Sequence, residues 1–183
     1  MKKIICLLFA VAFFENIFCQ DVIINGSNKY RLLTWDDFSG KPDKNSRYQA
    51  NTYWGLNYSF KGVDFIGDTI KLKGFSATLM FNENKSWVKE GTQTPSLLKH
   101  EQGHFDIGLI CQKEFINAIN NAVFFKAGLN EKVQSIFTGI MKKYHEMQVK
   151  YDEETDHSKN RQNQEKWDEI IAKTLQQNQQ TAF

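Results

Sequence analysis

Residues 94–105, TPSLLKHEQGHF, decide the fold of this chain. Thr94 is a residue type that caps helix N-termini, and Pro95 suits the first helical position. From Leu97 to Ile119, apolar residues recur at spacings near one helical turn. The stretch therefore predicts the start of a long amphipathic helix.

This helix carries His100, Glu101 and His104. Residues four apart lie on one face of a helix about one turn apart, so both imidazoles can reach one ion. Zinc accepts neutral histidine nitrogens at about 2.0–2.1 Å, and a catalytic zinc usually keeps one position open for water. Zinc lowers the pKa of bound water from about 15.7 to about 7, and Glu101 can take the proton. The spacing predicts two Zn²⁺ ligands and a general base; the alternative is two exposed histidines beside an unrelated glutamate.

A catalytic zinc normally has three protein ligands, so a third is expected elsewhere. The arrangement with a histidine six residues after the second is excluded, because Ile110 stands there. We favour His157, because a short loop at a predicted helix start could fold it back onto the first helix. His145 lies inside a predicted helix and is the weaker candidate for the third ligand. A carboxylate is the remaining alternative, since carboxylates also bind zinc; the candidates are Glu153, Glu154 and Asp156.

The chain before residue 91 is strand-like. Residues 48–60 alternate larger apolar and polar side chains, as a half-buried strand does, and residues 70–72 and 75–81 indicate further strands. Residues 40–43 indicate a loop.

After residue 91 the pattern is helical. Gly128 is predicted to end the first helix, and Asn130 to cap a second one that runs to about residue 151. A last helix follows the polar residues 152–157 and fades into a Gln-rich tail from about residue 176. Strands first and helices after predict an α+β class with a mostly antiparallel sheet. The length of 183 residues favours one domain over residues 20–183.

The first nineteen residues have the layout of a secretory signal peptide. Lys2 and Lys3 precede an apolar run over residues 4–14, and Cys19 marks a plausible cleavage point. The run is too short to span a bilayer, so no stable membrane insertion is expected after cleavage. The alternatives are a buried N-terminal segment or a lipoprotein, the latter disfavoured by bulky Phe18. The sequence predicts export, to the periplasm or out of the cell.

The net charge limits the kinds of binding partner that can be expected, and the cysteine content limits the disulfides. A formal net charge of +2 gives no electrostatic case for nucleic acid or for an anionic membrane surface. After signal cleavage Cys111 would be the only cysteine, so no intrachain disulfide is expected. Cys111, Trp35 and Trp54 are predicted core residues. Gly103 and Gly108 predict close packing against the first helix, because glycine weakens a helix.

Residues 97–107, LLKHEQGHFDI, resemble a bacterial family of unknown function predicted to be secreted zinc-dependent proteases. Three further segments resemble the same family; they are residues 33–38 with 40–42, residues 86–88, and residues 151–152 leading to 155–157. The resemblance implies a zincin-like fold and a later metal segment at Thr155, Asp156 and His157. Ser158 stands where the family would place glycine.

These observations predict a zinc-dependent hydrolase, a metallopeptidase that acts on a peptide or protein substrate. Residues 78–81 are the candidate edge strand for pairing with an extended peptide, or else an ordinary core strand. Tyr151, His145 and Arg161 are candidates for stabilising the oxyanion. The alternatives in function are a non-catalytic, metal-stabilised binding module of the envelope and a zinc amidase for cell-wall peptides.

Overall fold

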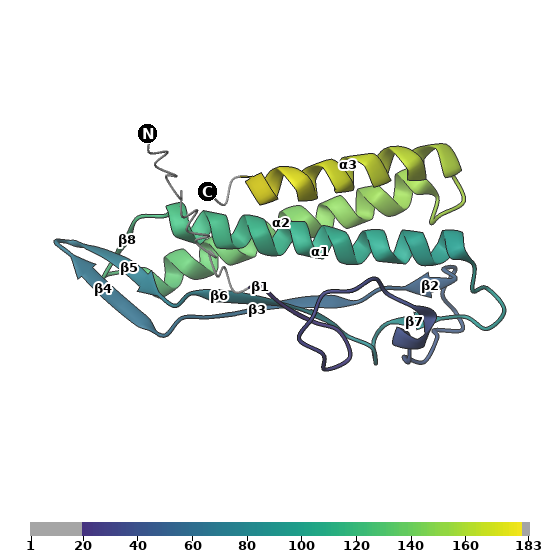
Figure 1. The fold of residues 1–183 in the computed structure, drawn as a ribbon, viewed down its shortest axis with the longest axis horizontal. Helices are drawn as coiled ribbons and strands as arrows, with labels where there is room; N and C mark the ends of the chain where they lie inside the picture. The colour runs from purple at the N-terminus through teal and green to yellow at the C-terminus, as the bar shows by residue number, and fades with distance from the viewer. Residues whose placement is uncertain (1–19, 181–183) are drawn as a thin grey trace, which may run out of the picture.

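Strands and helices form two layers in the computed structural model, which describes residues 20–180 (Figure 1). The strands come from the first half of the chain and the three helices from the second half, apart from one short strand between the first two helices. The predicted α+β class is confirmed. The predicted signal peptide, residues 1–19, lies outside the described residues.

The main sheet has three strands in the order β1, β6, β3. β1 (Gln20–Ile23) pairs in parallel with β6 (Ser76–Phe81), and β3 (Trp54–Ser59) pairs with β6 in antiparallel fashion. β6 is therefore the central strand, with Ala77, Leu79 and Phe81 buried. The prediction of an edge strand at residues 78–81 was wrong, because both edges of β6 are already paired.

Two smaller sheets extend this layer. β2 (Ala50–Asn51) pairs with β7 (Trp87–Val88), so the strand predicted over residues 48–60 is divided between β2 and β3. β4 (Gly62–Ile66), β5 (Thr69–Lys73) and β8 (Phe124–Phe125) form an antiparallel sheet at the far end of the molecule from β2 and β7 (Figure 1). A short 3-10 helix, η1 (Trp35–Asp37), follows β1.

The helices are α1 (Pro95–Asn121), α2 (Leu129–Thr155) and α3 (Arg161–Gln180). The predicted start of α1 is confirmed, since the Thr94 side chain accepts a hydrogen bond from the Leu97 amide. Gly128 was wrongly assigned as the end of this helix. It adopts φ +79° as the N-cap of α2, and β8 lies between it and α1.

α1 is the central helix of the molecule, in contact with β6, β3, α2 and α3. The side of α1 toward the sheet packs closely at Gly108, where an added Cβ would lie 2.9 Å from Trp54 and 3.0 Å from Leu79. Cys111 is fully buried and Trp54 nearly so, as predicted. Among the described residues, none of the helices is long and apolar enough to cross a bilayer.

Candidate metal centre

His100 and His104 share one face of α1, with Glu101 beside them, and all three residues are buried. These residues are 2%, 3% and 8% exposed, which is unusual for ionisable groups. Buried groups of this kind require partners, because an unpaired charge in the interior is costly. α2, α3 and the segment between β2 and β3 supply those partners.

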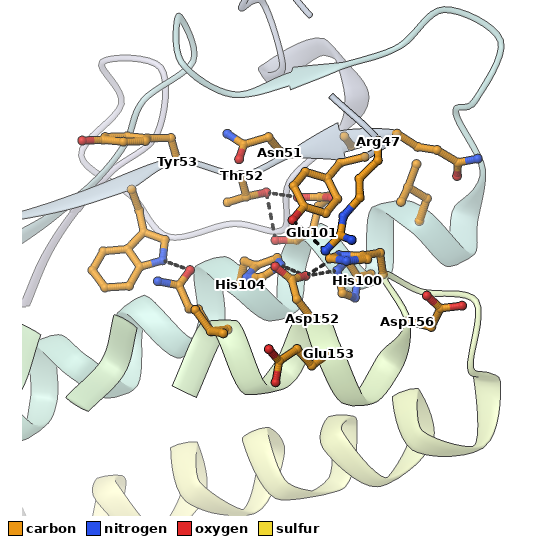
Figure 2. Close-up of a pocket in the computed structure, with 18 of the residues that line it drawn as sticks. Arg47, Asn51, Thr52, Tyr53, His100, Glu101, His104, Asp152, Glu153 and Asp156 are labelled. Atoms are coloured by element: carbon orange, nitrogen blue, oxygen red, sulfur yellow. Dashed lines mark hydrogen bonds and ion pairs between the residues drawn. The ribbon is translucent and has the colours of Figure 1, made fainter. Parts of the chain in front are cut away.

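Asp152 on α2 is the group on which three histidines converge; two of them, His100 and His104, are labelled beside it in Figure 2. Its Oδ1 atom lies 3.1 Å from His100 Nε2, 3.0 Å from His104 Nε2 and 3.2 Å from His157 Nδ1. The ligand atoms of His100, Asp152 and His157 lie within 4.8 Å of one another. This His/Asp/His group could hold a metal ion, with His104 on the same carboxylate oxygen.

The separations of Asp152 Oδ1 from the three histidine nitrogens can be compared with those between the ligands of a small tetrahedral ion. Ligands about 2.0–2.1 Å from zinc at tetrahedral angles lie about 3.3 Å from one another. The three contacts of Asp152 Oδ1, 3.0–3.2 Å, are close to that separation. Imidazole nitrogens with one carboxylate are also a donor set that zinc accepts.

The pKa shifts of Asp152 and His104 favour a negative carboxylate with a cation beside it. Burial by itself raises the pKa of Asp152, but hydrogen bonds from His100 and His104 outweigh it and hold this pKa well below its usual range. Burial lowers the pKa of His104, yet the hydrogen bond to Asp152 and the charges of Asp152 and Glu101 raise it overall. The carboxylate is therefore an anion that attracts a cation, either imidazolium or metal.

A left-handed turn brings His157 to the site. Asp156, His157 and Ser158 have φ values of +44°, +50° and +77°, a run that non-glycine residues adopt rarely. The turn ends α2 and folds the imidazole back onto Asp152, so His157 follows a helix end and not the predicted helix start. The ring of Tyr48 packs 4.4 Å from that of His157. Glycine would adopt the left-handed φ of Ser158 without strain.

Glu101 is held by Thr52, which follows β2. The Thr52 hydroxyl donates to Glu101 Oε2 at 2.7 Å (Figure 2). A hydroxyl has one hydrogen, so its 3.2 Å contact with the Glu101 carbonyl is secondary. One carboxylate oxygen is thereby fixed.

A cleft of about 730 Å³ opens over these residues, lined by residues 47–54 on the strand side and by α1 and α2. His145, Glu153 and Asp156 line it, whereas Glu154 binds the Trp167 indole. Two oxyanion candidates are contradicted by the geometry. They are Tyr151, which is fully buried and donates to the His100 carbonyl, and Arg161, which is paired with Glu165 outside the cleft.

Asp152 and Thr52 are the site residues that sequence reasoning missed. Asp152 lies in the acidic segment from which Glu153, Glu154 and Asp156 were drawn, but spacing could not choose among neighbours. Asp152 lies one helical turn before Thr155, but only the packing of α2 shows that both face His100. For Thr52 the sequence carried no signal.

Comparison with known proteins assigns the chain to a family. The family model described as "Bacterial protein of unknown function (DUF922)" matches residues 24–158. The chain belongs to this family. The match includes the α1 residues of the site, Asp152 and His157, and ends before α3. No curated protein and no solved structure matches the chain. The family description names no reaction, so the chemistry has to be argued from the site.

Proposed function

We propose that this protein is an exported zinc-dependent hydrolase with a zincin-like active site, and that it cleaves peptide bonds. The observation that carries the proposal is the convergence of three histidine nitrogens on one carboxylate oxygen, Oδ1 of Asp152, beside a buried glutamate and along the lining of a cleft. The predicted signal peptide supports the exported location. His100, His104 and His157 would hold the ion, with Asp152 against it.

Zinc at this position would polarise a substrate carbonyl and lower the pKa of water. Glu101 accepts the proton of the attacking water and passes it to the leaving amine. The Thr52 hydroxyl holds Oε2 of Glu101, which leaves Oε1 for the water. His145 is the exposed cleft residue best suited to donate a hydrogen bond to the developing oxyanion.

The strand beside the cleft is suited to bind an extended peptide. Gln49 and Tyr53 direct their backbone groups to the protein side, where the Gln49 carbonyl accepts from the Lys89 amide and the Tyr53 carbonyl from the Asn82 amide. Backbone groups alternate in direction along a strand, so those of Ala50 and Thr52 point to the opposite side. That edge borders the cleft and could pair with substrate.

A second candidate is a non-catalytic, metal-stabilised binding module. Asp152 favours it, because a fourth protein ligand would close the coordination sphere that a hydrolase leaves open for water. A zinc amidase for cell-wall peptides would use the same residues as the peptidase. Measurable hydrolysis would distinguish either enzyme from the binding module. The substrate that is cleaved, protein or cell-wall peptide, would distinguish the peptidase from the amidase.

The test is hydrolysis of a denatured protein mixture and of purified peptidoglycan by the zinc-loaded protein. Glu101→Gln should abolish turnover while keeping zinc, because it removes the base and spares the ligands. Glu131→Gln, at an exposed position at the start of α2, is the matched control and should cleave as wild type does. Zinc binding without turnover of either substrate would support the binding module.

A further inference from the structure

α3 reaches the metal centre although it lies beyond the residues that match the family. Gln164 on this helix is 5% exposed, and its Oε1 atom lies 3.0 Å from His100 Nδ1. This is the ring nitrogen on the far side from Asp152, which contacts Nε2. Gln164 is therefore the outer partner of a proposed zinc ligand.

The orientation of the Gln164 amide is fixed by its other neighbours. Its Nε2 atom donates to Asp168 Oδ1 at 2.8 Å and to the Tyr151 hydroxyl at 2.7 Å. A carboxylate only accepts hydrogen bonds, and Lys99 forms an ion pair with the other oxygen of Asp168. The amide nitrogen must therefore face Asp168, and the amide oxygen must face His100.

The surroundings of His100 Nδ1 then leave one choice of tautomer. An amide oxygen only accepts, so the hydrogen between Gln164 and His100 belongs to Nδ1. The second neighbour is the Thr155 hydroxyl at 3.5 Å, whose own hydrogen is donated to the Tyr151 carbonyl at 2.6 Å. Both neighbours of Nδ1 are acceptors. In the neutral ring that a metal would meet, Nε2 then carries the lone pair; in the metal-free site this nitrogen lies 3.1 Å from Asp152 Oδ1, which can only accept a hydrogen bond.

We propose that Asp168 and Gln164 act as positioning residues, a relay from α3 that fixes the Nδ1–H tautomer of His100 and so prepares Nε2 to bind the metal. The inference rests on the proposed metal centre. It extends the functional unit to α3. Outer partners of this kind typically change metal affinity by roughly 10–100-fold when removed.

Gln164→Leu tests the relay, because leucine has a similar size and no hydrogen-bonding groups. We expect its zinc affinity to fall by roughly 10–100-fold relative to wild type, measured by competition with a chromophoric chelator. Gln162→Leu, at an exposed position on the same helix, should bind zinc as wild type does. Far-UV circular dichroism checks that each variant is folded.

The double variant Gln164→Glu with Asp168→Asn separates the relay from packing. The carboxylate introduced at position 164 would still accept from His100 Nδ1, and the amide introduced at position 168 could donate to that carboxylate. Most of the zinc affinity should therefore return. A folded double variant that binds as weakly as Gln164→Leu would overturn the relay. Equal affinity in Gln164→Leu and wild type would do the same.

A readout on the metal-free protein keeps this inference distinct from the proposed function. Wild type should show a slowly exchanging Nδ1–H signal for His100 in ¹H–¹⁵N NMR, and Gln164→Leu should lose it. Absence of a hydrogen on Nδ1 in wild type would refute the relay. If wild type shows this signal but binds no zinc, the relay stands as hydrogen bonding and the proposed function fails.

Discussion

Replacing Gly103 with alanine would place a methyl group against Tyr151, the residue that supports both α1 histidines. An added Cβ would lie 2.3 Å from the Tyr151 hydroxyl oxygen and 2.8 Å from Cζ. Tyr151 is fully buried, and its ring stacks 4.6 Å from that of His100 and lies 5.0 Å from that of His104. The tyrosine cannot give way without moving the proposed ligands.

The change in the free energy of unfolding for Gly103→Ala is the sum of opposing contributions. Alanine in place of glycine stabilises a helix interior by about 1 kcal/mol. Overpacking costs about 1–3 kcal/mol, and displacing the Tyr151 hydroxyl from the His100 carbonyl and the Gln164 amide weakens two hydrogen bonds worth about 1 kcal/mol each. The free energy of unfolding should fall by about 2 kcal/mol.

Thermal unfolding of the metal-free protein measures this change, which corresponds to a Tm lower by roughly 4–8 °C for a chain of this size. The control is Gly139→Ala in α2, where an added Cβ meets nothing within 4 Å. It should raise the free energy of unfolding by about 1 kcal/mol. If Gly103→Ala stabilised the protein as Gly139→Ala does, the packing of Tyr151 on α1 would be refuted.

Three further predictions concern the turn after α2, Asp37 in η1, and Thr52, which holds Glu101. Ser158→Gly should raise the free energy of unfolding in urea by about 1 kcal/mol, because glycine adopts φ +77° without strain; no gain would contradict a strained turn. Burial by itself raises the pKa of Asp37, but hydrogen bonds from Arg31 and Thr34 lower it overall. The ionised carboxylate therefore stabilises the fold at pH values above the pKa of the unfolded state, about 4. Asp37→Asn should therefore cost about 2 kcal/mol at pH 7, with the difference from wild type shrinking as the pH falls below about 4; a difference independent of pH would count against the ion pair. Thr52→Val should keep zinc but lower kcat by on the order of 10-fold, with KM unchanged and activity retained in Thr52→Ser, because the hydroxyl orients Glu101; full activity in Thr52→Val would exclude that role.

Local features of the fold were predictable from the sequence. The start of α1 depends on Thr94 and Pro95, and the common face of His100 and His104 depends only on helix geometry. The close packing at Gly103 and Gly108 was also predictable, because glycine in a helix interior has a cost that packing can offset.

Features that depend on distant pairing were not predictable. β6 is central only because β1, whose residues lie 57 positions earlier than their partners, pairs with its second edge. Gly128 in a left-handed conformation fits a helix end as well as a helix start, so its role depended on finding β8. Asp152 was missed because the choice among neighbouring acidic residues depends on how α2 packs against α1.

The most direct test of the central claim is the zinc content of the protein, purified without chelator and supplied with zinc, beside His157→Ala and His145→Ala. The three-histidine site predicts about one zinc per chain in wild type and in His145→Ala, and much less in His157→Ala. Equal zinc in all three would exclude His157 as a necessary ligand. No zinc in wild type would contradict the metal centre itself.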